Sequence, residues 1–120
     1  MTVDSTNPES MSSPYSAFPT MFRRQPQPVA AADTIDAAIY GMPFDRSTNH
    51  RPGARYGPRA VRGASLELWW GDVWPWGFDP FDRLHVIDAG DVAHANGRHE
   101  QFYPLAEDLT AQIVAKNAIP

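Results

Sequence analysis

Residues 45–62, DRSTNHRPGARYGPRAVR, place five arginines on a backbone that also holds two glycines and two prolines. A guanidinium group binds carboxylates, phosphates and carbonyl oxygens, so each of these is a possible partner of the five arginines. Known phosphate loops read G-x-x-x-x-G-K-[ST] or G-x-G-x-x-G, whereas this segment has Gly53-x-x-x-Gly57 without a following Lys-Ser/Thr. The pattern favours a rigid connector in which Gly53 and Gly57 take positive φ angles and the arginines bind nearby carboxylates or carbonyls.

A second group of reactive side chains, Asp88, Asp91 and His94, has three-residue spacing in DAGDVAH. Carboxylates and imidazoles bind metal ions when they converge. Residues at this spacing converge on a helix, but the segment reads as a strand end and a turn, so turn capping by the Asp side chains is favoured. The histidines lie in no G-x-S-x-G or H-E-x-x-H motif, and no reaction follows from these residues alone.

Aromatic residues crowd a short segment in the middle of the chain. An aromatic cage for a cation is one interpretation. A loop packed on the core, or a subunit interface, is favoured because tryptophan is enriched at interfaces. The residues concerned are Trp69, Trp70, Trp74, Trp76, Phe78 and Phe81.

The composition limits the class of protein. The 120 residues carry a net charge of −4, which argues against a nucleic-acid partner because such proteins present a dominant basic face. The absence of cysteine excludes disulfides, thiolate metal sites and cysteine nucleophiles. No apolar run approaches the roughly 18 residues of a membrane span, and the first residues lack a secretory pattern. We therefore predict a cytoplasmic protein with no membrane partner.

The chain divides into three parts. Residues 1–14 are mostly Ser, Thr, Asn and Pro and predict a disordered tail. Residues 15–34 predict an extended arm that lays apolar side chains on another surface, because its prolines prevent a long helix. The apolar run at residues 37–40 then predicts a first strand buried on both faces.

Alternating elements follow this strand. A helix is expected to begin at Gly57–Pro58 and to turn Ala60, Val61, Ala64 and Leu68 inward. Residues 84–88 predict a second strand. A second helix is expected from about residue 99 or 103 to residue 116, because Phe102, Leu105, Leu109, Ile113 and Val114 recur at helical spacing, with Asn117 as its left-handed cap. Residues 118–120 then begin a new extended segment.

This order predicts an α/β fold with a mainly parallel sheet. Two strands and the start of a third bury too little surface for a stable domain. Residues 35–120 are therefore expected to be the N-terminal portion of a larger, incomplete domain.

Residues 35–120 also resemble the ureohydrolase (arginase/agmatinase) family. Its N-terminal signature is a strand ending in G-x-P-[FW]-D, then T-x-x-R-x-G-x-R-x-G-P-x-x-[IV]-R. WPWGFDPFDRLHVIDAGDV is similar to the agmatinase branch, and AQIVAKNAIP is similar to the segment before the family's G-G-D-H motif. The residues that match the signature are Gly41, Pro43, Phe44, Asp45, Thr48, Arg51, Gly53, Arg55, Gly57, Pro58, Val61 and Arg62.

The resemblance implies a three-layer α/β/α sandwich, a pair of Mn²⁺ ions and the hydrolysis of a guanidino compound. For agmatine the products would be putrescine and urea, a step of polyamine biosynthesis. The family's ligand motifs, G-G-D-H, D-A-H-x-D and D-x-D, do not occur in this sequence, so it is expected to hold no metal ligand and no catalytic residue and to be inactive alone. The family also implies a homotrimer or homohexamer.

The candidate site residues fall into two groups, and two of them, Arg46 and His50, depart from the family pattern, in which a small residue often stands. Asp45, Arg46 and His50 follow the first strand's carboxyl end and are candidates for the mouth of the substrate site. A structural motif is expected from Arg51, Gly53, Arg55, Gly57, Pro58, Arg62, Asp88 and Asp91. The alternatives are the same chemistry on guanidinobutyrate or another guanidino acid, a non-catalytic relative, or an α/β binding module with an anion-binding arginine loop.

Overall fold

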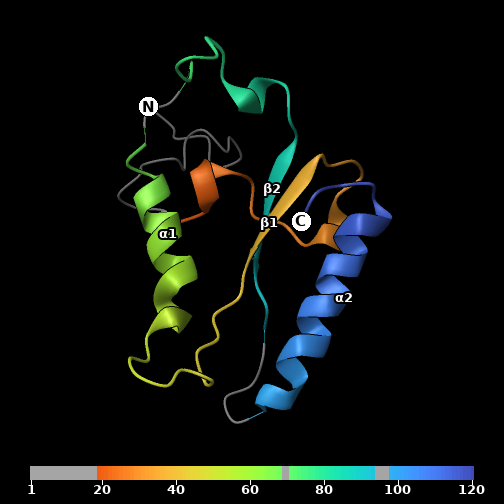
Figure 1. The fold of residues 1–120 in the computed structure, drawn as a ribbon. Helices are drawn as coiled ribbons and strands as arrows, with labels where there is room; N and C mark the ends of the chain where they lie inside the picture. Colours follow the sequence, from red (N-terminus) through yellow and green to blue (C-terminus); the bar gives the residue numbers. More distant parts are fainter. Residues whose placement is uncertain (1–18, 69–70, 94–97) are drawn as a thin grey trace, which may run out of the picture.

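The computed structural model describes residues 19–68, 71–93 and 98–120. Two parallel strands, β1 (Ala37–Gly41) and β2 (Val86–Asp91), lie between two helices, α1 (Gly57–Ser65) and α2 (Phe102–Ala115). Figure 1 shows α1 and α2 on opposite sides of the strands. The fold is therefore the predicted α/β arrangement of helix, sheet and helix layers.

Four segments run parallel in the sheet. β1 pairs with β2 from Ala37 opposite Val86 to Gly41 opposite Asp91, with a register shift between Ile39 and Gly41. On the other side of β1, Ile119 pairs with Ala37, so residues 118–120 are extended as predicted. On the outer edge of β2, Pro26 pairs with Asp88. The resulting order is residues 25–27, β2, β1 and the segment at Ile119.

The described part of the arm, residues 19–34, packs against this chain itself. Gln27 N donates to the carbonyl of Asp88, whose N–H donates to the carbonyl of Gln25, each at 3.1 Å. These bonds occupy the polar backbone groups of an otherwise open sheet edge. Short 3-10 helices at Met21–Arg23 and Val29–Ala31 interrupt the extended path. Residues 1–18, which include the predicted tail, lie outside the described residues.

The core lies between the sheet, the arm and α2. Its main cluster consists of Val29, Ala32, Ile35, Ala38, Ile87, Ile113 and Ala118. A smaller cluster of Val92, Phe102 and Ala106 lies where β2 leads into α2. Within the described residues, no helix is long and apolar enough to cross a membrane.

The limits of α2 agree closely with the sequence. A short 3-10 turn at His99–Gln101 leads into the helix, and Asn117 follows it with a φ of 57°, the left-handed conformation expected of the cap. Phe102 and Ile113 are buried, whereas Leu105 and Val114 are exposed and Ala106 is buried instead. β2 continues to Asp91 rather than ending at Asp88, because the ladder resumes after the register shift.

The predicted inward face of α1 is wrong. Val61 and Leu68 are each 54% exposed, and Ala60 and Ala64 are exposed as well. The buried residues of this helix are Arg62 and Ser65. A polar face therefore packs on the sheet, because Arg62 finds carboxylate partners on β2 that hydrophobic periodicity cannot reveal.

The aromatic loop does not pack its described tryptophans on the core. Trp74 is 89% exposed and Trp76 is 60% exposed, which contradicts a loop packed on the core by these two residues. Phe78 and Phe81 are half-buried, and each ring lies under an arginine, Arg83 and Arg24 respectively. Trp69 and Trp70 lie outside the described residues.

Candidate functional site at the carboxyl ends of β1 and β2

The carboxyl ends of the two strands meet at one edge of the sheet, called the carboxyl edge below. Gly41 ends β1 and pairs with Asp91, which ends β2. The chain continues from β1 to α1 and from β2 to α2, and these helices lie on opposite faces (Figure 1). In α/β sheets, ligands bind where neighbouring strands send their connections to opposite faces. This edge is therefore the candidate site.

Gly41 allows three segments to meet closely at this edge. A Cβ atom on Gly41 would lie 2.0 Å from Asp91 Oδ1 and 2.7 Å from Pro58 Cβ. Both distances are far shorter than normal van der Waals contact. The end of β1 can therefore approach Asp91 and the first turn of α1 only because residue 41 has no side chain.

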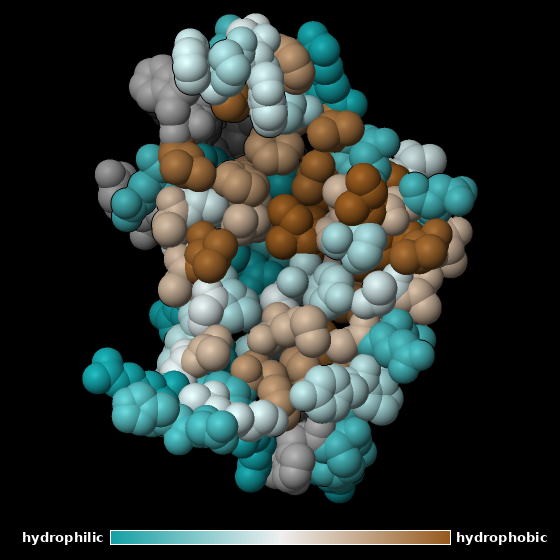
Figure 2. All heavy atoms as spheres, viewed as in Figure 1, coloured by the Kyte–Doolittle hydropathy of each residue, from teal (hydrophilic) through white to brown (hydrophobic). Residues whose placement is uncertain are grey.

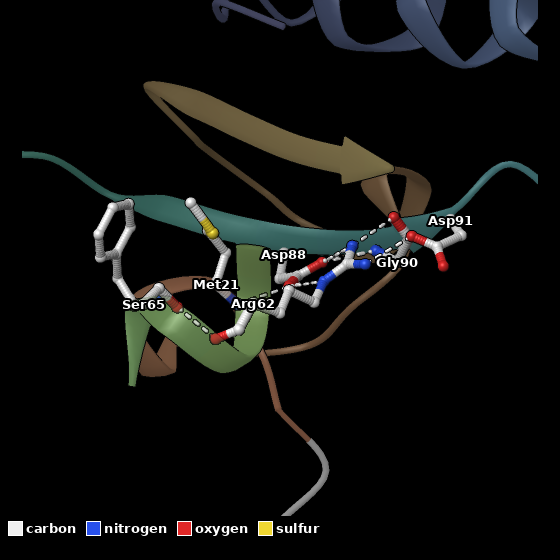
Figure 3. A network of polar contacts seen from close by, with 7 residues as sticks. Met21, Arg62, Ser65, Asp88, Gly90 and Asp91 are labelled. Atoms are coloured by element: carbon white, nitrogen blue, oxygen red, sulfur yellow. Dashed lines mark hydrogen bonds and ion pairs between the residues drawn. The ribbon is translucent and has the colours of Figure 1, made fainter. Parts of the chain in front are cut away.

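Arg62 connects α1 to the last residues of β2, as Figure 3 shows. Its Nε donates to Asp88 Oδ2 at 2.8 Å and its Nη2 to Asp88 Oδ1 at 2.9 Å, a bidentate pair. Nη1 donates to Asp91 Oδ1 at 2.5 Å, and Nη2 also donates to the carbonyl of Gly90 at 2.8 Å. The side chains of Arg62 and Asp88 are 10% and 2% exposed. The pair is thus largely withdrawn from water.

Asp88 stays ionised although it is buried. Burial raises the pKa of this carboxyl, but hydrogen bonds from Arg62, Met21 N and Gly90 N outweigh burial, and the pKa is lowered. The pKa of Arg62 is raised, chiefly by its hydrogen bonds to Asp88. Asp88 does cap its own turn through Gly90 N at 2.9 Å, as expected. Its main partner is nevertheless a helix residue distant in sequence.

The arm is attached to the same network. Met21 N donates to Asp88 Oδ2 at 2.7 Å, and Phe22 N donates to Ser65 Oγ at 2.9 Å. Ser65 in turn donates to the carbonyl of Arg62 at 2.7 Å. Phe22 and Arg23 have positive φ angles of 49° and 59°, which are uncommon for residues with side chains. These contacts hold the arm in that conformation against α1 and β2.

A second ion pair shapes the connector between β1 and α1. Arg55 donates to Asp45 Oδ1 through Nε at 2.8 Å and Nη2 at 2.5 Å. Asp45 Oδ2 accepts from the backbone N–H groups of Gly53 at 2.7 Å and Arg55 at 3.3 Å. The hydrogen bond from Arg55 is the largest cause that lowers the pKa of Asp45 to about 2. Gly53 has a φ of 141°, whereas Gly57 has a φ of −54° within α1, so the expected positive φ at Gly57 is wrong.

The other candidate residues of this connector face solvent. Arg46, His50 and Arg51 are exposed, and none belongs to an ion pair among the described residues. Figure 2 shows hydrophilic side chains gathered over the end of the molecule where Figure 1 draws this connector. Of the residues predicted for the mouth of the substrate site, Asp45 is therefore buried, whereas Arg46 and His50 are exposed.

An aromatic contact closes the inner side of the connector. The Phe44 ring stacks on Phe102 with centroids 4.6 Å apart and meets Tyr103 at 5.6 Å. Phe102 is buried at the start of α2. The chain leaving β1 is thus fixed against the chain entering α2. This stacking was not predicted, although the Phe of the P-[FW]-D motif was the available signal.

The described residues do not fit a metal centre. They contain no group of three or more His, Asp or Glu side chains placed to hold an ion. Asp88 and Asp91 bind Arg62 instead, and His94 lies outside the described residues. These residues can hold strand ends and a loop in place, and no reaction step is assigned to them.

Comparison with known proteins identifies what the chain is similar to. The model of the arginase family matches residues 35–120. An agmatinase from Edwardsiella ictaluri is 51% identical over 68 residues, which cover 56% of this chain and 22% of that protein. An agmatinase from Sodalis glossinidius is 40% identical over 85 residues, which cover 70% of this chain and 28% of that protein. The chain thus spans less than a third of these curated relatives.

Two solved structures share the fold. One is a crystal structure of a hypothetical agmatinase from Burkholderia thailandensis, with a TM-score of 0.76 and 36% identity, covering 88% of this chain and 33% of that chain. The other is proclavaminate amidino hydrolase from Streptomyces clavuligerus, with a TM-score of 0.74 and 29% identity, covering 87% of this chain and 34% of that chain. Both likenesses extend over most of the chain.

Proposed function

Because this chain belongs to the arginase family, we propose that the complete protein is an agmatinase-like ureohydrolase that converts agmatine to putrescine and urea. The observation that carries the proposal is the family match over residues 35–120, which includes both the β1–α1 connector and the β2 end. The similarity to curated agmatinases favours this branch of the family. Hydrolase chemistry is common to these relatives.

In this proposal the chain supplies the framework of the carboxyl edge. Arg62 fixes the end of β2 to α1, and Asp45 fixes the connector after β1. A pair of manganese ions is the proposed cofactor of the complete protein, where it would supply the nucleophilic water. Among the residues that the structure describes, none is proposed as its ligand.

A homotrimer or homohexamer is proposed as the assembly. The exposed Trp74 and Trp76 support it, because large aromatic side chains in solvent are typical of subunit contacts. Sedimentation velocity of the complete protein tests it, since a monomer at micromolar concentration would contradict the assembly.

A second candidate is the same hydrolysis on a guanidino acid such as guanidinobutyrate. Two observations favour it: the likeness to an amidino hydrolase of another substrate, and the exposure of Arg46 in the connector that follows β1. A guanidinium group binds a substrate carboxylate by charge-assisted hydrogen bonds and repels the amine of agmatine. Arg46 and His50 are therefore proposed to influence the choice of substrate.

Urea release tests both candidates. The complete protein with Mn²⁺ is assayed on agmatine, guanidinobutyrate and guanidinopropionate. The largest kcat/KM on agmatine supports the first candidate, and the largest on a carboxylated compound supports the second. No urea from any of them contradicts both and favours the non-catalytic relative.

The role of the exposed connector residues needs a separate experiment. Arg46→Ala with His50→Ala is expected to change the ratio of kcat/KM between agmatine and guanidinobutyrate by about tenfold, the value of one lost charge-assisted contact. Arg59→Ala is the matched control, because Arg59 is an exposed arginine of α1. An unchanged ratio in the double variant would remove Arg46 and His50 from the substrate site.

A further inference from the structure

We infer that Asp45 is a positioning residue, whose carboxylate sets the path of residues 46–52 and thereby the places of Arg46 and His50 at the carboxyl edge. The effect of Asp45 on substrate binding rests on the proposed function, whereas its effect on the loop does not. It assigns Asp45 a role that differs from contact with the substrate.

The carboxylate of Asp45 has no free face. Its side chain is 1% exposed. Oδ1 accepts from Nε and Nη2 of Arg55, and Oδ2 accepts from the backbone N–H groups of Gly53 and Arg55. Four donors saturate a carboxylate, which offers about four lone-pair sites. A substrate could reach this group only after the loop had opened.

Asp45 holds both ends of the exposed segment at residues 46–52. Its carbonyl accepts from Thr48 N at 3.2 Å at the beginning, and its carboxylate accepts from Gly53 N at the end. Every residue from 46 to 52 is exposed, so little apolar packing holds them. Gly53, whose N–H reaches the carboxylate, has a φ of 141°, a conformation that other residues rarely adopt.

The segment at residues 46–52 lies between two flanks that other contacts hold in place. Asp45 joins its beginning to Phe44, whose ring stacks on Phe102, and its far end leads through Gly53 and Ala54–Tyr56 into α1. Both flanks are therefore fixed by contacts, and the segment lies beyond the carboxyl end of β1, the side on which ligands of α/β sheets bind (Figure 1). A change in the hydrogen bonds of Asp45 moves the segment without moving the strands.

The experiment compares Asp45→Asn with the wild type in the complete protein. Limited trypsin digestion reports the loop directly, because the bond after Arg46 is accessible whereas Pro52 protects the bond after Arg51. Loss of the charge-assisted bonds is expected to raise the cleavage rate after Arg46 by about tenfold or more, since cleavage follows the population of the open loop. Asp33→Asn is the matched control at an exposed aspartate and is expected to leave the rate unchanged.

Steady-state kinetics report the positioning role. Asp45→Asn is expected to raise KM for the preferred guanidino substrate by about threefold to tenfold with a smaller change in kcat, because the loop's contacts are loosened. Arg55→Lys keeps the charge but loses the planar guanidinium, so its KM is expected to lie between the values of the wild type and Asp45→Asn. If Asp45→Asn fails to fold, Arg55→Gln tests the same pair from its half-exposed side.

Each outcome decides the inference. Unchanged cleavage after Arg46 in Asp45→Asn overturns it, and so does faster cleavage with unchanged KM and substrate preference. A wild-type protein that releases no urea refutes the proposed function, while the digestion still measures whether Asp45 holds the loop. Faster cleavage together with a raised KM supports the complete inference.

Discussion

Replacing Asp88 with asparagine is expected to destabilise the protein far more than the same change at Asp91. Asp88 is 2% exposed at its side chain and accepts four hydrogen bonds, two from Arg62 and one each from Met21 N and Gly90 N. An asparagine would place an NH₂ group against two of these donors and leave Arg62 without its main counter-charge. Removal of one partner from a buried ion pair costs about 3–5 kcal/mol, which is the expected loss.

Asp91 provides the matched comparison because it binds the same guanidinium. Its side chain is 41% exposed, and it accepts from Arg62 Nη1 through one oxygen, which asparagine retains as a carbonyl. Partly exposed ion pairs contribute about 0–1 kcal/mol. Asp91→Asn should therefore cost at least about 2 kcal/mol less than Asp88→Asn.

Urea-induced unfolding of the complete protein, followed by circular dichroism at neutral pH, measures both losses. The midpoints should separate in the stated order while the slope stays constant. Arg62→Lys retains the charge but not the bidentate guanidinium, so its urea midpoint should lie between those of the two aspartate variants. Equal midpoints for Asp88→Asn and Asp91→Asn would refute the reasoning, because burial would then not decide the strength of the two pairs.

Two further variants test the carboxyl edge. Gly41→Ala should destabilise the protein by about 1–3 kcal/mol in the same unfolding assay, because its Cβ would overlap Asp91 and Pro58. Gly63→Ala inside α1 is the control: its Cβ meets nothing within 4 Å, so it should stabilise the protein by up to about 1 kcal/mol. An unchanged stability of Gly41→Ala would contradict the close approach of the three segments. The carboxyl of Asp45, whose pKa falls from 3.8 to about 2, contributes stability that is present above pH 3.8 and is lost as the pH falls toward 2. The difference in urea midpoint between wild type and Asp45→Asn should therefore be constant above pH 4 and shrink below it, and a difference independent of pH would exclude the ionised carboxylate as its source.

Local signals in the sequence predicted most of the backbone path. Proline near a helix start, an apolar run bounded by polar residues and an asparagine after a helical pattern each act over a few residues. For this reason the start of α1, the centre of β1 and the cap at Asn117 agree with the structure. The extension of β2 beyond Asp88 was not predicted, because it depends on the pairing of Asp91 with Gly41 across a register shift.

The inward face of α1 could not be predicted from periodicity. Hydrophobic pattern places apolar residues inside, but Arg62 and Ser65 are buried here because their partners lie on β2 and on the arm. Those partners are distant in sequence, and only the folded arrangement brings them together. The signal that could have revealed them is the presence of unpaired opposite charges in two motifs, Arg62 in one and Asp88 in the other.

Ion pairs account for two of the five arginines that this mildly acidic chain places at residues 45–62. Arg55 binds a carboxylate at the beginning of the connector, and Arg62 binds carboxylates on the neighbouring strand, so the charges of these two residues are used by the fold. Both are bidentate or multiply hydrogen-bonded, and lysine could not replace the planar fork. Exposed cationic groups then remain at Arg46 and Arg51, in the segment that is fixed only at its ends. Among the described residues these two arginines take no part in the ion pairs that hold the framework, so this segment is where we propose that the choice of substrate is influenced.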